Sequence, residues 1–447
     1  LGEGEQYLLG RCSTSEPTNT SGGKALQTCG RDMAEIREAV IVDYARTPFG
    51  VASRKKPGFF ADKRADDLAV IVVEALIKRT GIDPATIDEV IMGAVYQGGE
   101  QSSPGRGIGL MTCPVEVAAL SIDRACCSSM TSAHIASMAI QLEMGDIYIA
   151  GGIESHSHFP APLITEDTDL VALAEEIGSS RGLPNVKIFD KVDLNAVVSM
   201  GLIAERLAAM YHISREEQDQ WALRGNLRAA AAQREGKFKH EIIPVEGKLP
   251  DGTVKLVDYD QGVRPDSTIE KIRSLTPLYK PDGTICAASA SDENDGAAVA
   301  VLMSKEKAEG LSLVPMVTIR SMAWVGVAPE IMGYGAAVAS RKALERAGLS
   351  IEDIDLVEIN EAFTVLPLLQ IKEMGIDPEK VNVNGGACCI GHPTGASGMR
   401  VLGTLAYEMN RRRARYGLAA ICGAWGAGAA TVVEREEYWE GRRAFSS

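Results

Sequence analysis

The sequence has no apolar run of about eighteen residues, and its nine cysteines include no CxxC pair. A helix that crosses a membrane needs about 20 mostly apolar residues, so we expect no membrane span. The cysteines are odd in number and lie beside glycine and serine. This pattern argues against a disulfide framework or a zinc site and favours a reducing cytoplasm. Positive charge is also scarce: the formal net charge is −14, which argues against nucleic acid as a partner.

The rest of the composition is typical of a globular protein. The chain has 447 residues, 45% of them hydrophobic and 24% charged, which predicts two or three domains. Residues 1–37 are rich in Gly, Ser and Thr over most of their length and lack the basic start and apolar core of a secretory signal. We expect this N-terminal extension to be poorly ordered, and we assign 439–447 to a C-terminal tail.

One stretch combines a strand, a thiol and a helix. The apolar run 118–122 predicts a buried strand, and the apolar spacing over 128–144 predicts a buried helix. Cys126 lies at the junction, where the unpaired N–H groups of the first helical turn bias a thiol toward the reactive thiolate. The alternative is that Cys126 and its neighbour Cys127 are small buried hydrophobes. This stretch alone leaves both interpretations open.

An internal repeat predicts two similar halves. Residues 81–90 align without a gap on 348–357, and each copy is followed by a glycine-rich turn into a helix and then by a strand that ends in glycine. Between them, 159–284 is irregular at first and then strongly helical, which predicts an inserted lid domain. Ser214-Arg215-Glu216-Glu217 in this segment predicts a capping box, with Ser at the N-cap and Glu at N3. The expected organisation is an N-terminal half made of 38–158 plus 285–311, and a C-terminal half at 312–438.

Three further motifs carry chemistry. Asn360-Glu361-Ala362-Phe363 follows an apolar strand, residues 385–398 hold His392 in a glycine-flanked turn, and Ile421-Cys422-Gly423-Ala424 ends a strand with a thiol. Together with the Cys126 stretch and Gly151-Gly152-Ile153-Glu154-Ser155, these motifs resemble the thiolase family of acetyl-CoA acetyltransferases and 3-ketoacyl-CoA thiolases. The resemblance covers 39–434. It implies an α/β fold with two βαβαβαββ halves, a five-layered α-β-α-β-α core and an inserted lid.

The resemblance also implies a role for each motif. Cys126 is the nucleophile that carries the acyl group, His392 accepts its proton, and Cys422 moves the proton at the substrate α-carbon or on the departing thiol. The reaction is a double displacement in which a 3-oxoacyl-CoA is cleaved by CoA, or formed in reverse. One oxyanion site is His392 with a water held by Asn360, and the other is the backbone N–H of Cys126 with that of Ala424.

Coenzyme A enters as a co-substrate, and we expect no tightly bound cofactor and no metal. Its phosphates need local positive charge because the chain is acidic. Arg224, Arg228 and Lys237 lie in or just after the long lid helix and are the candidates, and Ser291 matches a family serine near the pantetheine. These residues form the predicted CoA site.

Departures from the family pattern fall around the acyl pocket. His156 stands where the family favours Met or small residues, and Trp425 fills a position that is usually glycine. These changes favour a bulky, branched or aromatic 3-oxoacyl-CoA as an alternative to a short one. Residues 159–191 hold few basic or aromatic residues, which raises the alternative that a partner subunit completes the enzyme. Otherwise we expect a homodimer or homotetramer.

Overall fold

The computed structural model describes residues 36–53, 57–159, 164–168, 191–192 and 199–436. All elements named below belong to the compact unit Arg37–Ser447. The predictions made for 1–35, for most of 159–191 and for the tail at 439–447 lie outside the described residues. Among the helices of the described part, none is both long enough and apolar enough to span a membrane.

The N-terminal half follows the predicted βαβαβαββ order. Its elements are β1 (Ala39–Arg46), α1 (Ala65–Thr80), β3 (Glu89–Gly93), α2 (Pro104–Thr112), β4 (Ala118–Ile122), α3 (Ser128–Gln141), β5 (Ile147–Ser155) and β8 (Asn294–Ser304). The short β2 (Gly50–Val51) pairs with β8, and α9 (Lys305–Gly310) follows it. Strands β4 and β5 run parallel to β3, whereas β8 is antiparallel to both β5 and β1. β8 is buried over its whole length, as its apolar run 297–303 requires.

The C-terminal half repeats this order with one strand missing. Its elements are β9 (Val317–Gly326), α10 (Gly335–Ala347), β10 (Leu356–Ile359), α11 (Val365–Met374), α13 (Ser397–Arg412), β11 (Tyr416–Gly423) and β12 (Ala427–Glu434). Where the repeat predicts a counterpart of β4, the described chain has only a bridge between Val357 and Val381. The amide of Asn382 accepts from the N–H of Ile359 (2.8 Å) and donates to its carbonyl (2.9 Å). The side-chain amide of Asn382 thus makes the hydrogen bonds to β10 that the backbone of a neighbouring strand would have made.

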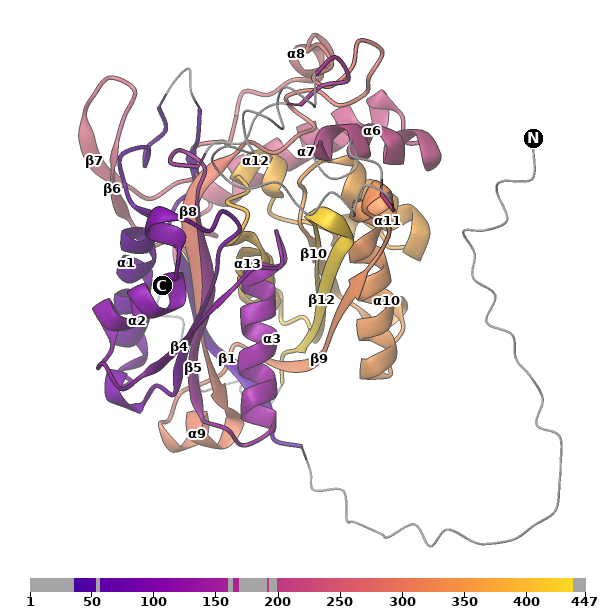
Figure 1. Ribbon diagram of the computed structural model, residues 1–447. Helices are drawn as coiled ribbons and strands as arrows, with labels where there is room; N and C mark the ends of the chain where they lie inside the picture. The colour runs from indigo at the N-terminus through magenta and orange to yellow at the C-terminus, as the bar shows by residue number, and fades with distance from the viewer. Residues whose placement is uncertain (1–35, 54–56, 160–163, 169–190, 193–198, 437–447) are drawn as a thin grey trace, which may run out of the picture. The chain divides into compact units, whose positions relative to one another are not determined.

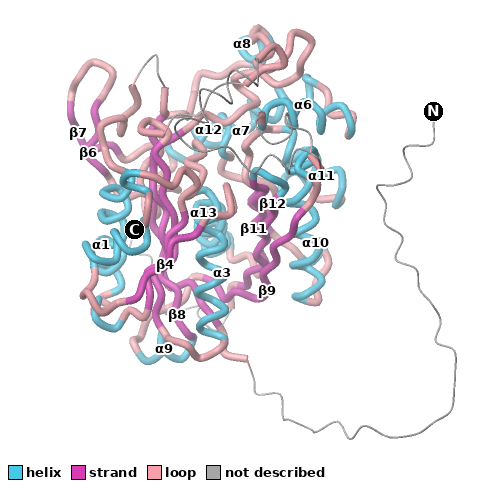
Figure 2. The backbone as a smooth tube through the Cα atoms, in the orientation of Figure 1, coloured by secondary structure: helices cyan, strands magenta, loops and turns pink. Residues whose placement is uncertain are grey.

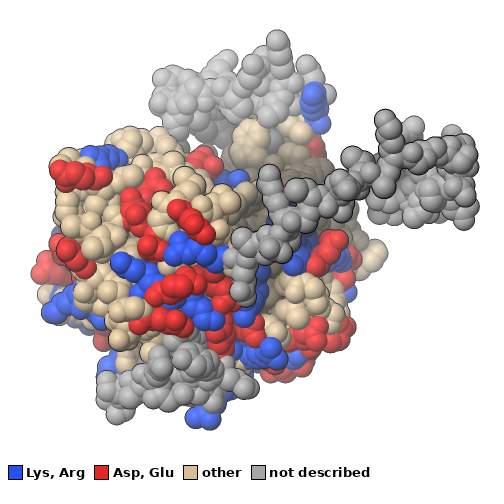
Figure 3. Space-filling view, turned by 90° about the horizontal axis from the view of Figure 1, so that it is seen from below, with Lys and Arg blue, Asp and Glu red and all other residues tan. Residues whose placement is uncertain are grey.

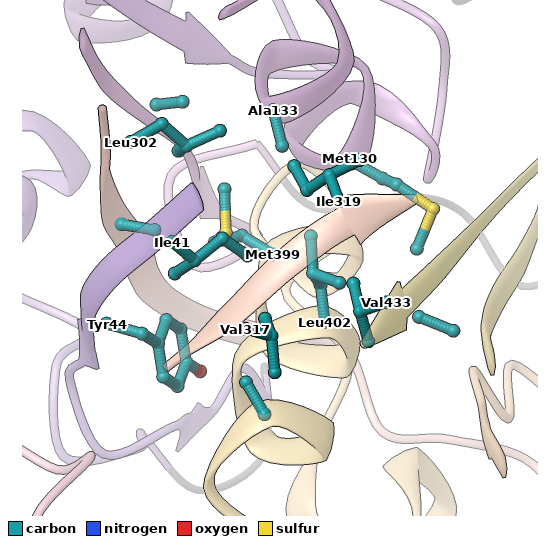
Figure 4. Close-up of a cluster of buried hydrophobic side chains, with 14 of the residues drawn as sticks. Ile41, Tyr44, Met130, Ala133, Leu302, Val317, Ile319, Met399, Leu402 and Val433 are labelled. Carbon is teal, nitrogen blue, oxygen red and sulfur yellow. The ribbon is translucent and has the colours of Figure 1, made fainter. Parts of the chain in front are cut away.

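The two half-sheets form one path, β10-β11-β12-β9-β1-β8-β5-β3-β4, in which β1 and β9 are joined by two residue pairs only. Helices α1 and α2 cover the outer face of the first half-sheet, α10 and α11 that of the second, and α3 and α13 lie between them (Figures 1 and 2). The central layer packs Met130, Met399 and Leu402 against Ile41 and Ile319 (Figure 4). The predicted α-β-α-β-α layering is confirmed.

The insertion contains α6 (Met200–Met210), α7 (Arg215–Arg234), the β6 (Val245–Lys248) and β7 (Val254–Val257) hairpin, and α8 (Ile269–Arg273). The capping box predicted at the start of α7 is present between Ser214 and Glu217. Apolar side chains of α6 and α7, such as Leu207 and Trp221, share a core with the C-terminal half. On the face that Figure 3 displays, acidic and basic side chains are interspersed, so the negative net charge forms no single-sign patch there.

Candidate active site

Cys126 lies in a sharp turn between β4 and α3. Ala125 adopts a left-handed backbone with φ 47°, which costs a non-glycine residue about 1–2 kcal/mol. Three hydrogen bonds hold the turn. Asp123 Oδ1 accepts from the Ala125 N–H (2.8 Å), and Ser128 Oγ accepts from the Arg124 N–H (2.8 Å) and donates to the Ala125 carbonyl (2.6 Å). The predicted strand–helix junction is confirmed, although the helix ends at Gln141 rather than 144. The strand itself is partly exposed at the edge of the sheet, not buried as predicted.

The structure distinguishes the two neighbouring cysteines. Cys126 is half-buried, whereas Cys127 is 0% exposed and its Sγ faces the Ile421 carbonyl at 3.5 Å. Cys127 is therefore the packing residue of the pair, and Cys126 is the one that a ligand can reach.

The predicted thiolate bias of Cys126 is wrong for this geometry. The pKa of its thiol is raised to about 12. Burial is the largest cause, the Glu154 carboxylate adds to it, and the N–H groups of Ala424 and of Cys126 itself oppose it. Loss of hydration thus outweighs the helix N-terminus. The two N–H groups that act on this sulfur are the pair predicted for an oxyanion site.

His392 follows α12 (Ala387–Ile390) in a turn that Gly391 enters with φ 119°. Its N–H donates to Asn294 Oδ1 (2.7 Å), and its Nδ1 lies 2.6 Å from Ser397 Oγ. The Ser397 hydroxyl donates its only hydrogen to the Pro393 carbonyl (2.8 Å), so it accepts from Nδ1–H. In this tautomer, Nε2 keeps its lone pair and can accept a proton.

Asn360, directly after β10, places its Nδ2 at 3.4 Å from His392 Nε2. Burial, with smaller contributions from His156 and Arg400, lowers the pKa of His392 to about 3. The imidazole is therefore neutral at physiological pH, as a general base requires.

Cys422 lies at the end of β11 and is 2% exposed. Burial raises the pKa of its thiol well above the ordinary value, and the neighbouring Cys126 raises it further. The next residue, Gly423, touches the Cys126 turn: a Cβ there would lie 3.1 Å from Cys127 Sγ and 3.2 Å from the Arg124 carbonyl. The two halves thus meet at their strand ends.

Sequence reasoning noted Glu154 within a family motif and gave it no role. Its buried carboxylate accepts from five N–H or O–H groups: those of Val95, Tyr96, Gln101, Thr394 and Gly395. Burial raises the pKa of Glu154, and these donors oppose the shift. Because Thr394 and Gly395 follow His392 closely, this carboxylate fixes the histidine turn on the N-terminal half.

The two predicted pocket residues differ in their surroundings. His156 is 3% exposed, packs edge-on to Tyr96 (5.3 Å between ring centroids) and places Nε2 at 3.3 Å from Thr394 Oγ1. Its Nδ1 makes no hydrogen bond, and burial lowers its pKa to about 4. Trp425 is 42% exposed and has φ 66°, a conformation that favours glycine. His156 therefore lies beside the His392 turn, and Trp425 follows Ala424.

The basic residues predicted for CoA have protein partners. Arg224 donates to the carbonyls of Pro378 (2.5 Å) and Val381 (3.0 Å), and Arg228 pairs with Glu379 at 2.5 Å. In addition, Lys237 pairs with Glu235 at 3.1 Å, and the Ser291 N–H donates to the Ala362 carbonyl at 2.9 Å. The two arginines thus anchor the 378–381 loop, and a role of all four residues in CoA binding stays a prediction.

Within the described ranges, no three His, Cys, Asp or Glu side chains are grouped so that they could hold a metal ion. The site itself brings together two thiols, a neutral imidazole and oriented N–H donors.

Comparisons with known proteins agree with this geometry. The family model for the thiolase N-terminal domain matches residues 39–306, and that for the thiolase C-terminal domain matches 313–435. A 3-ketoacyl-CoA thiolase of Marinobacter nauticus is 43% identical over 406 residues, which are 89% of this chain and 98% of that protein. One of Pseudoalteromonas translucida is 41% identical over 408 residues, covering 90% and 99%.

Solved structures give the same result. The crystal structure of Bacillus anthracis acetyl-CoA acetyltransferase superposes with a TM-score of 0.78 at 35% identity, covering 89% of this chain and 99% of that one. Human mitochondrial 3-ketoacyl-CoA thiolase in complex with CoA gives 0.78 at 32% identity, covering 90% and 98%. Both family models and relatives above 40% identity span nearly the whole described body. The chain therefore belongs to the thiolase family of acyltransferases.

Proposed function

We propose that the protein is a 3-oxoacyl-CoA thiolase that cleaves its substrate with CoA into acetyl-CoA, or another short acyl-CoA, and a shortened acyl-CoA, or catalyses the reverse condensation. The observation that carries the proposal is the meeting of chain turns around one half-buried thiol. The N–H of Ala424 lowers the pKa of Cys126, Cys126 helps to raise the pKa of the buried Cys422 thiol, and a neutral His392 has its Nε2 beside Asn360.

In the first half-reaction, Cys126 Sγ attacks the 3-oxo carbon while His392 Nε2 takes the thiol proton. The bond between C2 and C3 then breaks, and the acyl group stays on Cys126 as a thioester. The leaving acetyl-CoA enolate takes a proton at C2 from Cys422. The enzyme is left with an acyl-cysteine, an imidazolium and a Cys422 thiolate.

The second half-reaction restores each group. The CoA thiol gives its proton to Cys422 and attacks the thioester carbon, and the departing Cys126 sulfur recovers its proton from His392. The N–H groups of Cys126 and Ala424 stabilise the oxyanion on the attacked carbonyl, and His392, with a water held by Asn360, stabilises the enolate oxygen. The two half-reactions make a ping-pong mechanism in which CoA is the only co-substrate required.

The acyl substrate is the finer part of the proposal. His156 Nδ1 makes no hydrogen bond and lies 4.0 Å from Glu293 Oε2 beside the His392 turn, and Trp425 adds an indole next to Ala424. These side chains support an acyl group that is bulky or aromatic rather than acetoacetyl. Arg224, Arg228, Lys237 and Ser291 stay the proposed CoA contacts, and contact between CoA phosphates and the two arginines requires the 378–381 loop to release them.

The protein is also proposed to act as a homodimer or homotetramer in the cytoplasm. Strand β4 ends the sheet path and is exposed along part of its length, and apolar side chains of α2, of β4 and of the segment between them are exposed there: Leu110, Met111, Val115 and Leu120. An uncovered strand edge with apolar neighbours supports self-association. The seven cysteines in the described part of the chain are free, which supports a reducing compartment.

The test is thiolysis by the purified protein alone. CoA-dependent cleavage of short, long and aromatic 3-oxoacyl-CoA thioesters is followed by loss of 3-oxoacyl-CoA, with light scattering to determine the oligomeric state. Activity on at least one class, with an acyl adduct on Cys126 in mass spectra, supports the proposal. If no thioester is cleaved by the protein alone but cleavage appears with an added cell fraction, the alternative of a required partner subunit holds. Lack of cleavage in both assays refutes the proposal.

A further inference from the structure

One face of α13 contacts both His392 and Asn360 at atoms that the reaction does not use. Ser397 and Arg400 are three residues apart and therefore lie on the same side of the helix. Ser397 Oγ lies 2.6 Å from His392 Nδ1, the nitrogen opposite to the proposed base, and Arg400 donates to Asn360 Oδ1 at 3.3 Å. A single helix face thus sets the position of one catalytic side chain relative to the other.

Arg400 is 0% exposed and bridges two residues of the β10 segment. Its Nη1 donates to Glu358 Oε1 at 2.7 Å, and the pair is shielded on both sides, with side-chain exposures of 0% and 4%. Its Nη2 reaches Asn360, while its Nε makes no hydrogen bond. The guanidinium is therefore fixed by Glu358 through Nη1, and its Nη2 donates to the asparagine.

This contact decides which way the Asn360 amide faces. A guanidinium has only donors, so it accommodates the Oδ1 of an amide and repels the NH₂ group. With Oδ1 held by Arg400, Nδ2 must face His392, where it lies 3.4 Å from Nε2. If the amide were reversed, two donors would face each other at Arg400, and Oδ1 would face the lone pair of the histidine.

We propose that Arg400 is a positioning residue for the thiolase reaction, which holds the Asn360 amide with its NH₂ group toward His392 and the enolate oxygen. The inference rests on the proposed function and adds a residue to it. The charge of Arg400 supports the same site in a second way, because it helps to lower the pKa of His392 and so keeps the base neutral.

A purely structural role for a buried ion pair is the competing explanation, and the chain offers a matched control. Arg46 is also 0% exposed and pairs with buried Glu241 (2.9 Å) and Asp260 (2.6 Å). Its side-chain hydrogen bonds go to these two carboxylates and to the Thr47 carbonyl. Lysine at either position keeps the charge and removes the planar fork that reaches two partners at once.

The experiment is a double-mutant cycle between each arginine and Asn360, measured by kcat and KM for thiolysis. We expect Asn360→Ala to lower kcat about 10²–10³-fold, as loss of an oxyanion donor does. Arg400→Lys should lower kcat about 10-fold or more in the wild type and less than about 3-fold in Asn360→Ala, with little change in KM. Arg46→Lys should have the same effect in both backgrounds. Equal effects of Arg400→Lys in both backgrounds would overturn the inference.

Two further measurements keep the result decisive. If Arg400→Lys does not fold, the pair Glu358→Gln with Arg400→Gln removes both charges, so that neither is left buried alone, and it enters the same cycle. A crystal structure of the variant gives a readout without turnover: Asn360 displaced from His392 supports the inference, and an unmoved Asn360 refutes it. If the wild type shows no thiolysis, the proposed function is refuted. If Asn360 is nevertheless displaced in the crystal structure of the variant, the positioning role of Arg400 is still supported.

Discussion

Replacing Glu154 with glutamine tests the carboxylate that joins the two halves at the site. Glu154 Oε1 accepts from the Tyr96 N–H (3.2 Å) and Gln101 Nε2 (2.6 Å). Oε2 accepts from the N–H groups of Val95 (3.0 Å) and Gly395 (2.9 Å) and from the Thr394 hydroxyl (2.6 Å). Glutamine has the same shape, so the substitution changes hydrogen bonding and charge while it leaves the packing volume nearly unchanged.

The magnitude follows from this arrangement. The glutamine NH₂ group must occupy one of the two oxygen positions, and each position faces at least two donors, so at least two hydrogen bonds are lost. A hydrogen bond to a charged group contributes about 1.5–3 kcal/mol, so the free energy of unfolding should fall by about 3–6 kcal/mol. That is a large fraction of the 5–15 kcal/mol or so that stabilises a typical protein.

Urea unfolding followed by circular dichroism measures the change. Glu379→Gln is the matched control: its carboxylate pairs with Arg228 but is 73% exposed, so its loss should cost less than about 1 kcal/mol. A loss for Glu154→Gln that is no larger than that of the control would refute the reasoning. It would mean that the five donors find other partners when the carboxylate is gone.

Three further predictions concern the site itself. Cys126→Ala should abolish acyl transfer, and an acyl adduct found by mass spectrometry on Cys127 in that variant would contradict the choice between the two neighbours. Trp425→Gly should shift the chain-length preference more than the rate of the chemical step, and equal loss of activity on short and long substrates would contradict this. The same substitution relieves the positive φ and should stabilise the fold by about 1 kcal/mol. Because burial raises the pKa of Cys126 to about 12, its thiolate fraction rises about tenfold per pH unit below that value, so iodoacetamide alkylation should accelerate steadily from about pH 7 to 10. A plateau above neutral pH would indicate a preformed thiolate.

Local signals in the sequence predicted the main helices and strands and the position of Cys126 between them. The repeat at 81–90 and 348–357 aligns Gly81 with Gly348, and these glycines end α1 and α10 in the same conformation, with φ 68° and 66°. The capping box at Ser214 formed as predicted, and Cys126 lies between the predicted strand and helix. These features depend on residues within one or two turns of each other, so the chain encodes them before any distant segment is in place.

Tertiary structure alone decided the contacts and energies of the site. The pKa of Cys126 depends on how much water the second half removes from it, and the junction by itself predicted the opposite direction. The Asn382 side chain bonds to β10 where the family resemblance predicted a further strand. The 378–381 loop binds two arginines that their position in the lid helix had assigned to CoA. Glu154 and Arg400 acquired their roles from partners far away in the chain. Desolvation and hydrogen-bond pairing arise only when distant segments pack together, so no local pattern could encode them.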